Sequence, residues 1–372
     1  MKNVAGFMIV SALFLLFVGC QSETGESGGE GRLQVIATVF PQFDFVRQIA
    51  GDRVELSMLI SPGAEAHGFE PSPRDIVAMY SADLIIYIGG HDDVWLGPIL
   101  HSIGRDDMRT VALTDLVELV LQEIVEGMEI YHPHDHHHDH EHHDHDHHDH
   151  DHDDHEHHDH DHEHHDDNHD HDHEHGHHDD NHDHDHGHHH HHDHDHVHYD
   201  EHVWTCPRNA ITIVEALTEV LSELDPANES FFRENAAAFI NELRELDAEF
   251  TQVVAEGARR TIVFGDRFPF RYLTDTYGIT YFAAFTGCSA ETQASPGTIA
   301  FLIEKVREEN IPVIFHIEFS NLLIANTIVR ETGTRLVEMH SAHNVSHEDF
   351  NAGVTYIDIM RRNIESLREG LN

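Results

Sequence analysis

The sequence predicts an α/β protein of two lobes, each with a mostly parallel sheet, joined by one long rigid helix. Short apolar, β-rich runs alternate with amphipathic segments, a pattern typical of parallel sheets covered by helices. The pattern occurs twice, once on each side of a His/Asp-rich block at residues 131–200. Without this block and the N-terminal segment, roughly 270 residues remain, enough for two compact lobes.

The elements of each lobe follow from these runs. In the first lobe we expect strands at 33–39, 54–60 and 84–88, with helices near 43–50 and 72–80. In the second lobe we expect strands at 261–264, 279–282, 313–315 and 335–339, separated by helices near 270–277, 296–309 and 320–331.

A segment of another kind lies between the lobes. Asp225 can cap a helix that begins at Pro226, and apolar residues then follow at spacings of three and four until Gly257. A helix over residues 226–256 would be about 45 Å long at 1.5 Å per residue. Such a helix is a stiff connector, and its apolar stripe must also be buried against a lobe.

The block at 131–200 is composed almost entirely of His, Asp and Glu. It holds 37 of the 45 His residues, since only eight lie elsewhere, and it contains no Lys or Arg. Imidazole and carboxylate groups are ligands for divalent transition metals, and almost no apolar residues are present to form a core. We therefore expect a disordered metal-capture loop, because simple solvation of a loop would not require a repeated imidazole.

The charge of the chain excludes one class of partner. The block holds 25 of the 70 acidic residues, so the remainder has 45 acidic and 21 basic residues, a net charge of −24. A surface this acidic repels nucleic acid and anionic lipid and attracts cations. We expect no nucleic-acid partner.

The N-terminus has the features of an export signal. Lys2 precedes an apolar run at residues 4–18, which is short for a membrane span, and Gly19 and Cys20 follow. The sequence Phe17-Val18-Gly19-Cys20 resembles a bacterial lipobox, although Leu is usual at the position of Phe17. We expect cleavage before Cys20, lipidation of Cys20 and a flexible tether after it. The remaining cysteines, Cys206 and Cys288, are too far apart in sequence for a pairing to be assigned.

A first candidate metal ligand follows the second expected strand. His67 lies in the sequence Pro62-Gly63-Ala64-Glu65-Ala66-His67-Gly68-Phe69-Glu70-Pro71, whose prolines and glycines restrict the loop. Ligands of α/β proteins bind beyond the carboxyl ends of strands, and Glu65 and Glu70 add negative potential there.

The run from Pro62 to Pro73 resembles the first metal-site loop of the zinc and manganese solute-binding proteins of ABC transporters (cluster A-I). Asp200-Glu201-His202-Val203-Trp204, directly after the His/Asp-rich block, resembles the second metal-site motif of that family. The resemblance covers the mature chain, and His-rich loops occur at this place in the zinc-uptake receptors of the group. It implies two lobes with a metal site in the cleft between them.

The resemblance also implies the ligands. His67 and His202 match the first two positions, whereas Gly265 stands where the third His of the family is usual. The last position, usually an Asp, aligns with His340, so His67, His202 and His340 preserve three imidazoles. Asp266, Glu318, Glu65 or a water is the candidate fourth ligand.

Other polar residues near these motifs receive smaller roles. Asp266 can instead cap the next helix or pair with Arg267, and Glu318 can also cap a helix. Glu291 lies in a loop that can border the cleft. His316 is expected to face the sheet, and His343 is expected to hydrogen-bond locally.

These observations predict the following organisation: a lipoprotein signal peptide (1–19), a tether (20–31), an N-terminal lobe (32–225) that includes the loop 131–200, a linking helix (226–257) and a C-terminal lobe (258–372). The resemblance implies an exported, lipid-anchored Zn²⁺ receptor that delivers metal to an ABC permease and its ATPase, which are encoded separately. An imidazole-rich site favours Zn²⁺ over Mn²⁺, which remains an alternative.

The sequence also bears on two other classes of function, an enzyme and a surface metal-storage or adhesin lipoprotein. An enzyme is disfavoured because, outside the His/Asp-rich block, the sequence has no His-Glu-x-x-His motif and no phosphate-binding Gly-Lys loop. A surface metal-storage or adhesin lipoprotein remains an alternative, with the His/Asp-rich block as its working part.

Overall fold

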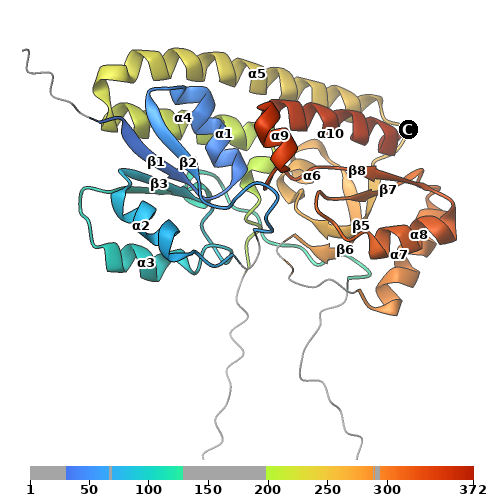
Figure 1. Cartoon of the computed structure of the whole chain (residues 1–372). Coiled ribbons are helices and arrows are strands. Elements are labelled where there is room, and N and C mark those ends of the chain that lie inside the picture. The colour runs from blue at the N-terminus through green and yellow to red at the C-terminus, as the bar shows by residue number, and fades with distance from the viewer. Residues whose placement is uncertain (1–30, 67–68, 129–197, 288, 290–293) are drawn as a thin grey trace, which may run out of the picture. The chain divides into compact units, whose positions relative to one another are not determined.

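The computed structural model describes residues 31–66, 69–128, 198–287, 289 and 294–372. Its two parallel four-stranded sheets confirm the predicted fold class (Figure 1). The expected signal peptide, Cys20, His67, Cys288, Glu291 and nearly all of the His/Asp-rich loop lie outside the described residues. Among the described helices, none is long and apolar enough to span a membrane.

The first sheet has the strand order β2-β1-β3-β4. Its strands are β1 (Leu33–Ala37), β2 (Val54–Met58), β3 (Leu84–Tyr87) and β4 (Arg109–Ala112), and all adjacent pairs are parallel. Helices α2 (Pro73–Ser81) and α3 (Leu96–Ile103) pack on one face through Met79, Leu96 and Ile103. The other face packs on α1 (Phe40–Ala50) and α4 (Pro207–Leu224).

The second sheet repeats this arrangement in the order β6-β5-β7-β8, again with parallel neighbours. Its strands are β5 (Thr261–Phe268), β6 (Thr280–Thr286), β7 (Val313–His316) and β8 (Arg335–Glu338). Helices α7 (Pro296–Glu308) and α8 (Leu323–Thr332) cover one face with their own small core. The other face packs in the main core with α6 (Arg271–Tyr277) and α10 (Tyr356–Leu371), while the short α9 (His347–Ala352) precedes α10.

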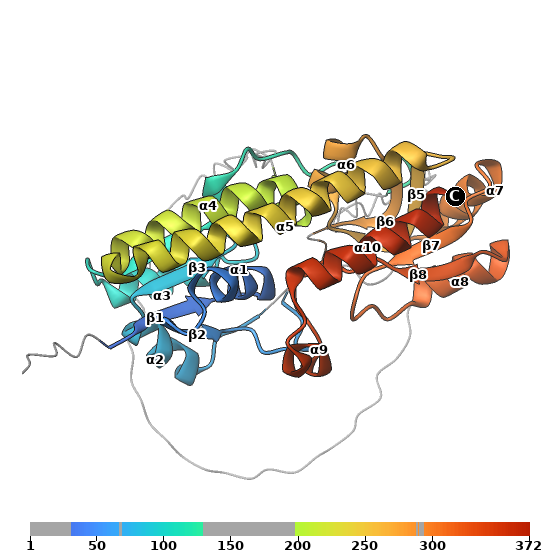
Figure 2. The same ribbon diagram turned by 90° about the horizontal axis from the view of Figure 1, so that it is seen from above.

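The long helix α5 (Glu229–Glu256) extends alongside both sheets (Figures 1 and 2). Its buried stripe includes Phe232, Leu243 and Phe250, which belong to one hydrophobic core shared by residues of both halves. The helix begins three residues later than predicted, because α4 ends at Leu224 and Pro226–Asn228 forms a 3₁₀ turn that reverses the chain. With 28 residues it is about 42 Å long.

Candidate metal centre

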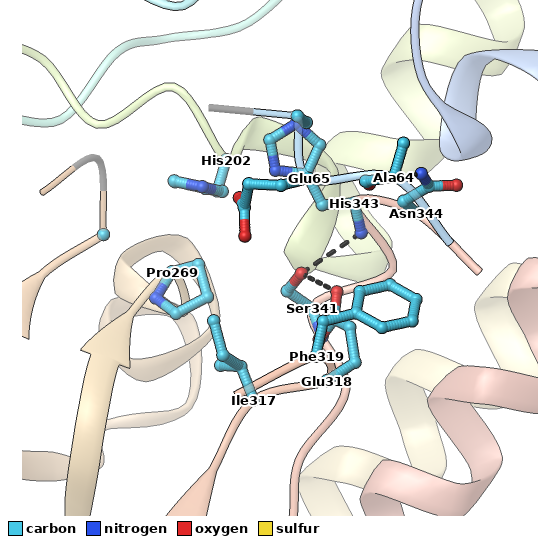
Figure 3. A pocket seen from close by; sticks show the side chains of 12 residues that line it. Ala64, Glu65, His202, Pro269, Ile317, Glu318, Phe319, Ser341, His343 and Asn344 are labelled. Carbon is cyan, nitrogen blue, oxygen red and sulfur yellow. Dashed lines mark hydrogen bonds between the residues drawn. The ribbon is translucent and has the colours of Figure 1, made fainter. Parts of the chain in front are cut away.

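A small cavity lies where loops of the two halves meet (Figure 3). Its volume is about 30 Å³, which is room for one or two waters or a single metal ion. The loop after β2, the segment before α4, and the loops after β5, β7 and β8 all contribute to its wall. The lining residues are Ala64, Glu65, Ala66, His202, Pro269, Gly287, Ile317, Glu318, Phe319, Ser341, His343 and Asn344.

His202, one of the predicted ligands, lines this cavity, and its ring is held by a buried carboxylate. The backbone N–H of His202 donates to Asp200 Oδ1 at 2.9 Å, and its ring Nδ1 lies 3.1 Å from the same oxygen. Both side chains are at least 98% buried, being 1% and 2% exposed. A carboxylate that accepts from Nδ1 fixes the tautomer that leaves Nε2 free of a proton, the arrangement common for His ligands of metals.

Three side-chain hydrogen bonds attach the His202 segment to the second half of the chain. Tyr272 Oη donates to the Asp200 carbonyl at 2.7 Å, and Tyr356 Oη donates to the Trp204 carbonyl at 2.6 Å. Trp204 Nε1 donates to the Ser341 carbonyl at 2.9 Å. His202 therefore has a fixed position relative to the loop after β8, although it precedes the linking helix in sequence.

Gly287, at the end of β6, makes room for the His202 ring. A Cβ atom at this position would lie 3.0 Å from His202 Cε1 and 3.0 Å from the Phe268 carbonyl oxygen. These distances are below ordinary van der Waals contact, so a side chain at 287 would displace the imidazole.

His343 supplies the second imidazole on the cavity. Its ring centroid lies 5.6 Å from that of His202 and 5.2 Å from the Trp204 ring, and the residue is 6% exposed. The expectation that His343 would only hydrogen-bond locally therefore missed its place on the cavity wall. The two imidazoles come from segments about 140 residues apart, a distance in sequence that hides their proximity.

His340 is not among the residues that line the cavity, in contrast to its predicted place there. Its backbone N–H donates to Asn363 Oδ1, and its carbonyl accepts from Asn363 Nδ2. Its ring Nδ1 accepts from the Ala342 N–H at 3.0 Å. Through these bonds His340 stabilises the conformation of the loop after β8.

Glu318 organises the same loop from the end of β7. Its carboxylate accepts from the Ser341 N–H at 2.7 Å and from the Ser341 hydroxyl, and Ser341 Oγ accepts from the His343 N–H at 3.1 Å (Figure 3). Glu318 lines the cavity, and each of its oxygens accepts a hydrogen bond from Ser341. Its role in the described structure is to position His343.

Glu65 and Asp266, the other candidate fourth ligands, lie in different surroundings. Glu65 lines the cavity and pairs with Arg267 across the two halves at 3.5 Å. Asp266 instead lines an adjacent cavity of about 130 Å³, together with Glu65, Arg267 and Glu318. Its oxygens accept from the Arg267 and Ile317 N–H groups.

Gly265, at the position where the resemblance implies a third His, lies against helix α8. A Cβ atom at 265 would lie 2.5 Å from the Cα and 2.8 Å from the Cβ of Ala325 in α8. Strand β5 and helix α8 approach too closely for any side chain. A third imidazole cannot come from this position without moving α8.

Glu201, next to His202 in sequence, is a buried acid. The Glu201 carboxylate accepts from the backbone N–H groups of His91 and Asp92, and Gly90, with φ of 106°, allows this contact. Burial raises the pKa of Glu201, and the charge of Asp92 adds to that increase. The carboxyl groups of Asp200 and Glu201 thus belong to the two residues that precede His202 in sequence, and carboxylates close to an imidazole favour a cation.

Among the described residues, no three His, Cys, Asp or Glu side chains form a complete metal-binding group. His316 Nδ1 lies 2.8 Å from the Ile317 carbonyl, and the Cys206 thiol is buried against Thr276. Burial raises the pKa of Cys206, so its thiol is not a ready metal ligand.

A family model described as "Zinc-uptake complex component A periplasmic" matches residues 35–370. The chain belongs to this zinc-uptake component family. The resemblance inferred from the two metal-site motifs is thereby confirmed.

Individual relatives of the zinc-uptake component family agree. The zinc-binding lipoprotein AdcA of Streptococcus pneumoniae is 26% identical over 99% of this chain, which spans only 61% of that protein. The high-affinity zinc uptake system protein ZnuA of Bacillus subtilis is also 26% identical, over 100% of this chain and 98% of its own length. The Zn(II)-bound ZnuA-like domain of S. pneumoniae AdcA shares the fold, with a TM-score of 0.63 and 23% identity, covering 92% of this chain and 99% of that domain.

Proposed function

We propose that this chain is an extracytoplasmic receptor that binds Zn²⁺ and delivers it for uptake, and that it is not an enzyme. The observation that carries the proposal is the pair of buried imidazoles, His202 and His343, facing an ion-sized cavity. Asp200 and the Ser341–Glu318 pair hold the two residues in place, so little ordering is needed on binding.

The proposed ligand set is His202 and His343, with Glu65 as the carboxylate and His67 as a further imidazole. His343 replaces His340 because His343 lines the cavity and His340 does not. Glu65 is preferred over Asp266, which lines the adjacent cavity, and over Glu318, whose carboxylate holds Ser341 of the His343 loop. An imidazole-rich site of four ligands suits Zn²⁺ better than Mn²⁺.

The partners and location are part of the same proposal. Zn²⁺ is the cargo, and an ABC permease with its ATPase, encoded separately, is the receiver. Lipid attachment at Cys20 would hold the receptor at the outer face of the cytoplasmic membrane or in the periplasm. We also propose the division into lobes at 32–225 and 258–372, joined by the helix at 226–257, which the two separate sheets support.

Titration with Zn²⁺ tests this function against metal storage. We expect one tight site per chain followed by several weak sites from the block at 131–200. A variant lacking residues 132–198 should keep the tight site and lose the weak ones. If that variant loses nearly all its capacity, the chain is a storage protein. The weak sites should disappear well below pH 6, because imidazole must be neutral to bind metal.

A further inference from the structure

Three consecutive residues of the loop after β8, His343, Asn344 and Val345, bond to the first half of the chain. The His343 carbonyl accepts from the Phe40 N–H at 3.2 Å, and the Val345 carbonyl accepts from the Gly63 N–H at 2.7 Å. Asn344 Nδ2, between them, donates to the carbonyls of Ser61 and Ala64 at 2.8 Å each.

The orientation of the Asn344 amide follows from its partners. Its Oδ1 accepts from the Val345 N–H at 2.8 Å, so its NH₂ group must face the two carbonyls. The residue is 3% exposed and lines the cavity. Both donors of one buried carboxamide are therefore used on a single loop.

The loop that Asn344 holds is a tight turn. Ala64 N–H donates to the Ser61 carbonyl at 3.1 Å, and Pro62 and Gly63, with a φ of 75° at Gly63, are the central residues expected of a type II turn. Glu65, the proposed carboxylate ligand, follows the turn directly. Among the described residues, one other hydrogen bond joins this turn to the loop after β8, from the Gly63 N–H to the Val345 carbonyl.

We propose that Asn344 is a positioning residue that latches the Ser61–Ala64 turn to the His343 loop and thereby sets the rate of metal release. This inference rests on the proposed function. The cavity wall includes Ala64, Glu65 and Ala66 on one side and Ser341, His343 and Asn344 on the other. An ion between these walls leaves when the turn separates from the His343 loop, and that separation breaks both Asn344 bonds.

The direct test compares Zn²⁺ release from the full chain and from Asn344→Ala, measured by transfer to a chromogenic chelator after the weak sites have emptied. Loss of two hydrogen bonds should speed release about ten- to hundredfold, with the association rate nearly unchanged. Asn235→Ala is the matched control, because Asn235 Nδ2 donates to the Ile49 carbonyl at 3.1 Å, far from the cavity. The control should lose thermal stability without faster release.

The possible outcomes distinguish failure of the Asn344 latch from failure of the proposed Zn²⁺-receptor function. If the wild-type chain has no slowly released Zn²⁺, the proposed function fails. If it has slow release that Asn344→Ala does not accelerate, or accelerates no more than Asn235→Ala, only the latch is overturned.

A second test uses the wild-type chain, so that it does not depend on the folding of Asn344→Ala. Hydrogen exchange of the Gly63 amide, under conditions in which every opening leads to exchange, gives the opening rate of the turn. The latch requires that Zn²⁺ leave no faster than this rate. Release faster than opening would contradict it.

Discussion

The two histidines after β8 show how position within a loop decides the use of a side chain. His340 and His343 are three residues apart, yet the ring of His340 accepts from the Ala342 N–H and that of His343 borders the cavity. The sequence alone could not distinguish them, because the difference depends on Glu318 and Asn363, which come from other elements.

We predict that His202→Ala and His343→Ala each weaken tight Zn²⁺ binding by at least about a hundredfold, since each removes an imidazole ligand. His340→Ala should alter affinity by less than about tenfold, because His340 acts only through the loop. Competition titration with a chelator measures all three. Equal losses of Zn²⁺ affinity in His340→Ala and His343→Ala would show that His340 is also a metal ligand.

A second prediction concerns Asp93, whose buried carboxylate accepts from the Ile88 and Gly89 N–H groups. Burial raises its pKa from 3.8 to about 6. Between pH 4 and 6 the folded chain keeps a proton that the unfolded chain releases, so stability falls as pH rises through this range. The whole penalty is present above pH 6.

Asp93→Asn removes that charge but keeps an acceptor oxygen. Denaturant unfolding of the metal-free chain should therefore show the variant to be more stable than the wild type at pH 7.5, by up to about 3 kcal/mol. At pH 4 the two should be nearly equal. A stability gain of the same size at both pH values would show that charge burial is not the cause.

At the scale of elements, the apolar runs in the sequence predicted seven of the eight described strands. β1, β2, β3, β5, β7 and β8 begin at the expected residues and β6 begins one residue later, because short apolar runs between polar turns are a strong signal. The edge strand β4 was missed, since Arg109–Ala112 is short and half exposed. Helix α4 was missed because it follows the metal-site motif directly, and its start depends on Pro207 rather than on a polar cap.

Helix α5 gives a prediction at this scale. Phe250 is fully buried, and its ring stacks on that of Tyr277 at a centroid distance of 5.4 Å. Phe250→Ala should lower the free energy of unfolding by about 3–5 kcal/mol, because it leaves a cavity in the shared core. The exposed neighbour Glu245→Ala should have little effect in the same urea titration. Equal effects would contradict the packing of α5.

At the scale of the described molecule, the two sheets are joined by more than the linking helix. Arg47 donates to the Val354 carbonyl at 3.0 Å, and the Asp44 carboxylate accepts from the Tyr356 N–H at 2.6 Å. The main hydrophobic core also contains residues from both halves. The sequence predicted a stiff connector, but it could not show these ties, because each depends on residues about 300 positions apart.

These ties predict small motion on metal loading. Small-angle scattering from a variant lacking residues 132–198 should give nearly the same radius of gyration with and without Zn²⁺, because separation of the lobes would expose the shared core. Hydrogen exchange should slow mainly near His202 and the Ser61–Ala66 loop. A large compaction on loading would show instead that the lobes hinge.

The antiparallel bridge between Leu121 and Tyr199 affects how the length of the His/Asp-rich block can change in evolution. Tyr199 is followed directly by Asp200 and His202, and Tyr272 bonds to both Val120 and Asp200, so described residues on both sides of the His/Asp-rich block are fixed to the folded protein. For a flexible loop, each doubling of length adds only about 0.6 kcal/mol of closure entropy. Repeats can thus be gained or lost over generations without disturbing the two-lobed protein, and natural variants should differ in tract length far more than in the residues on either side.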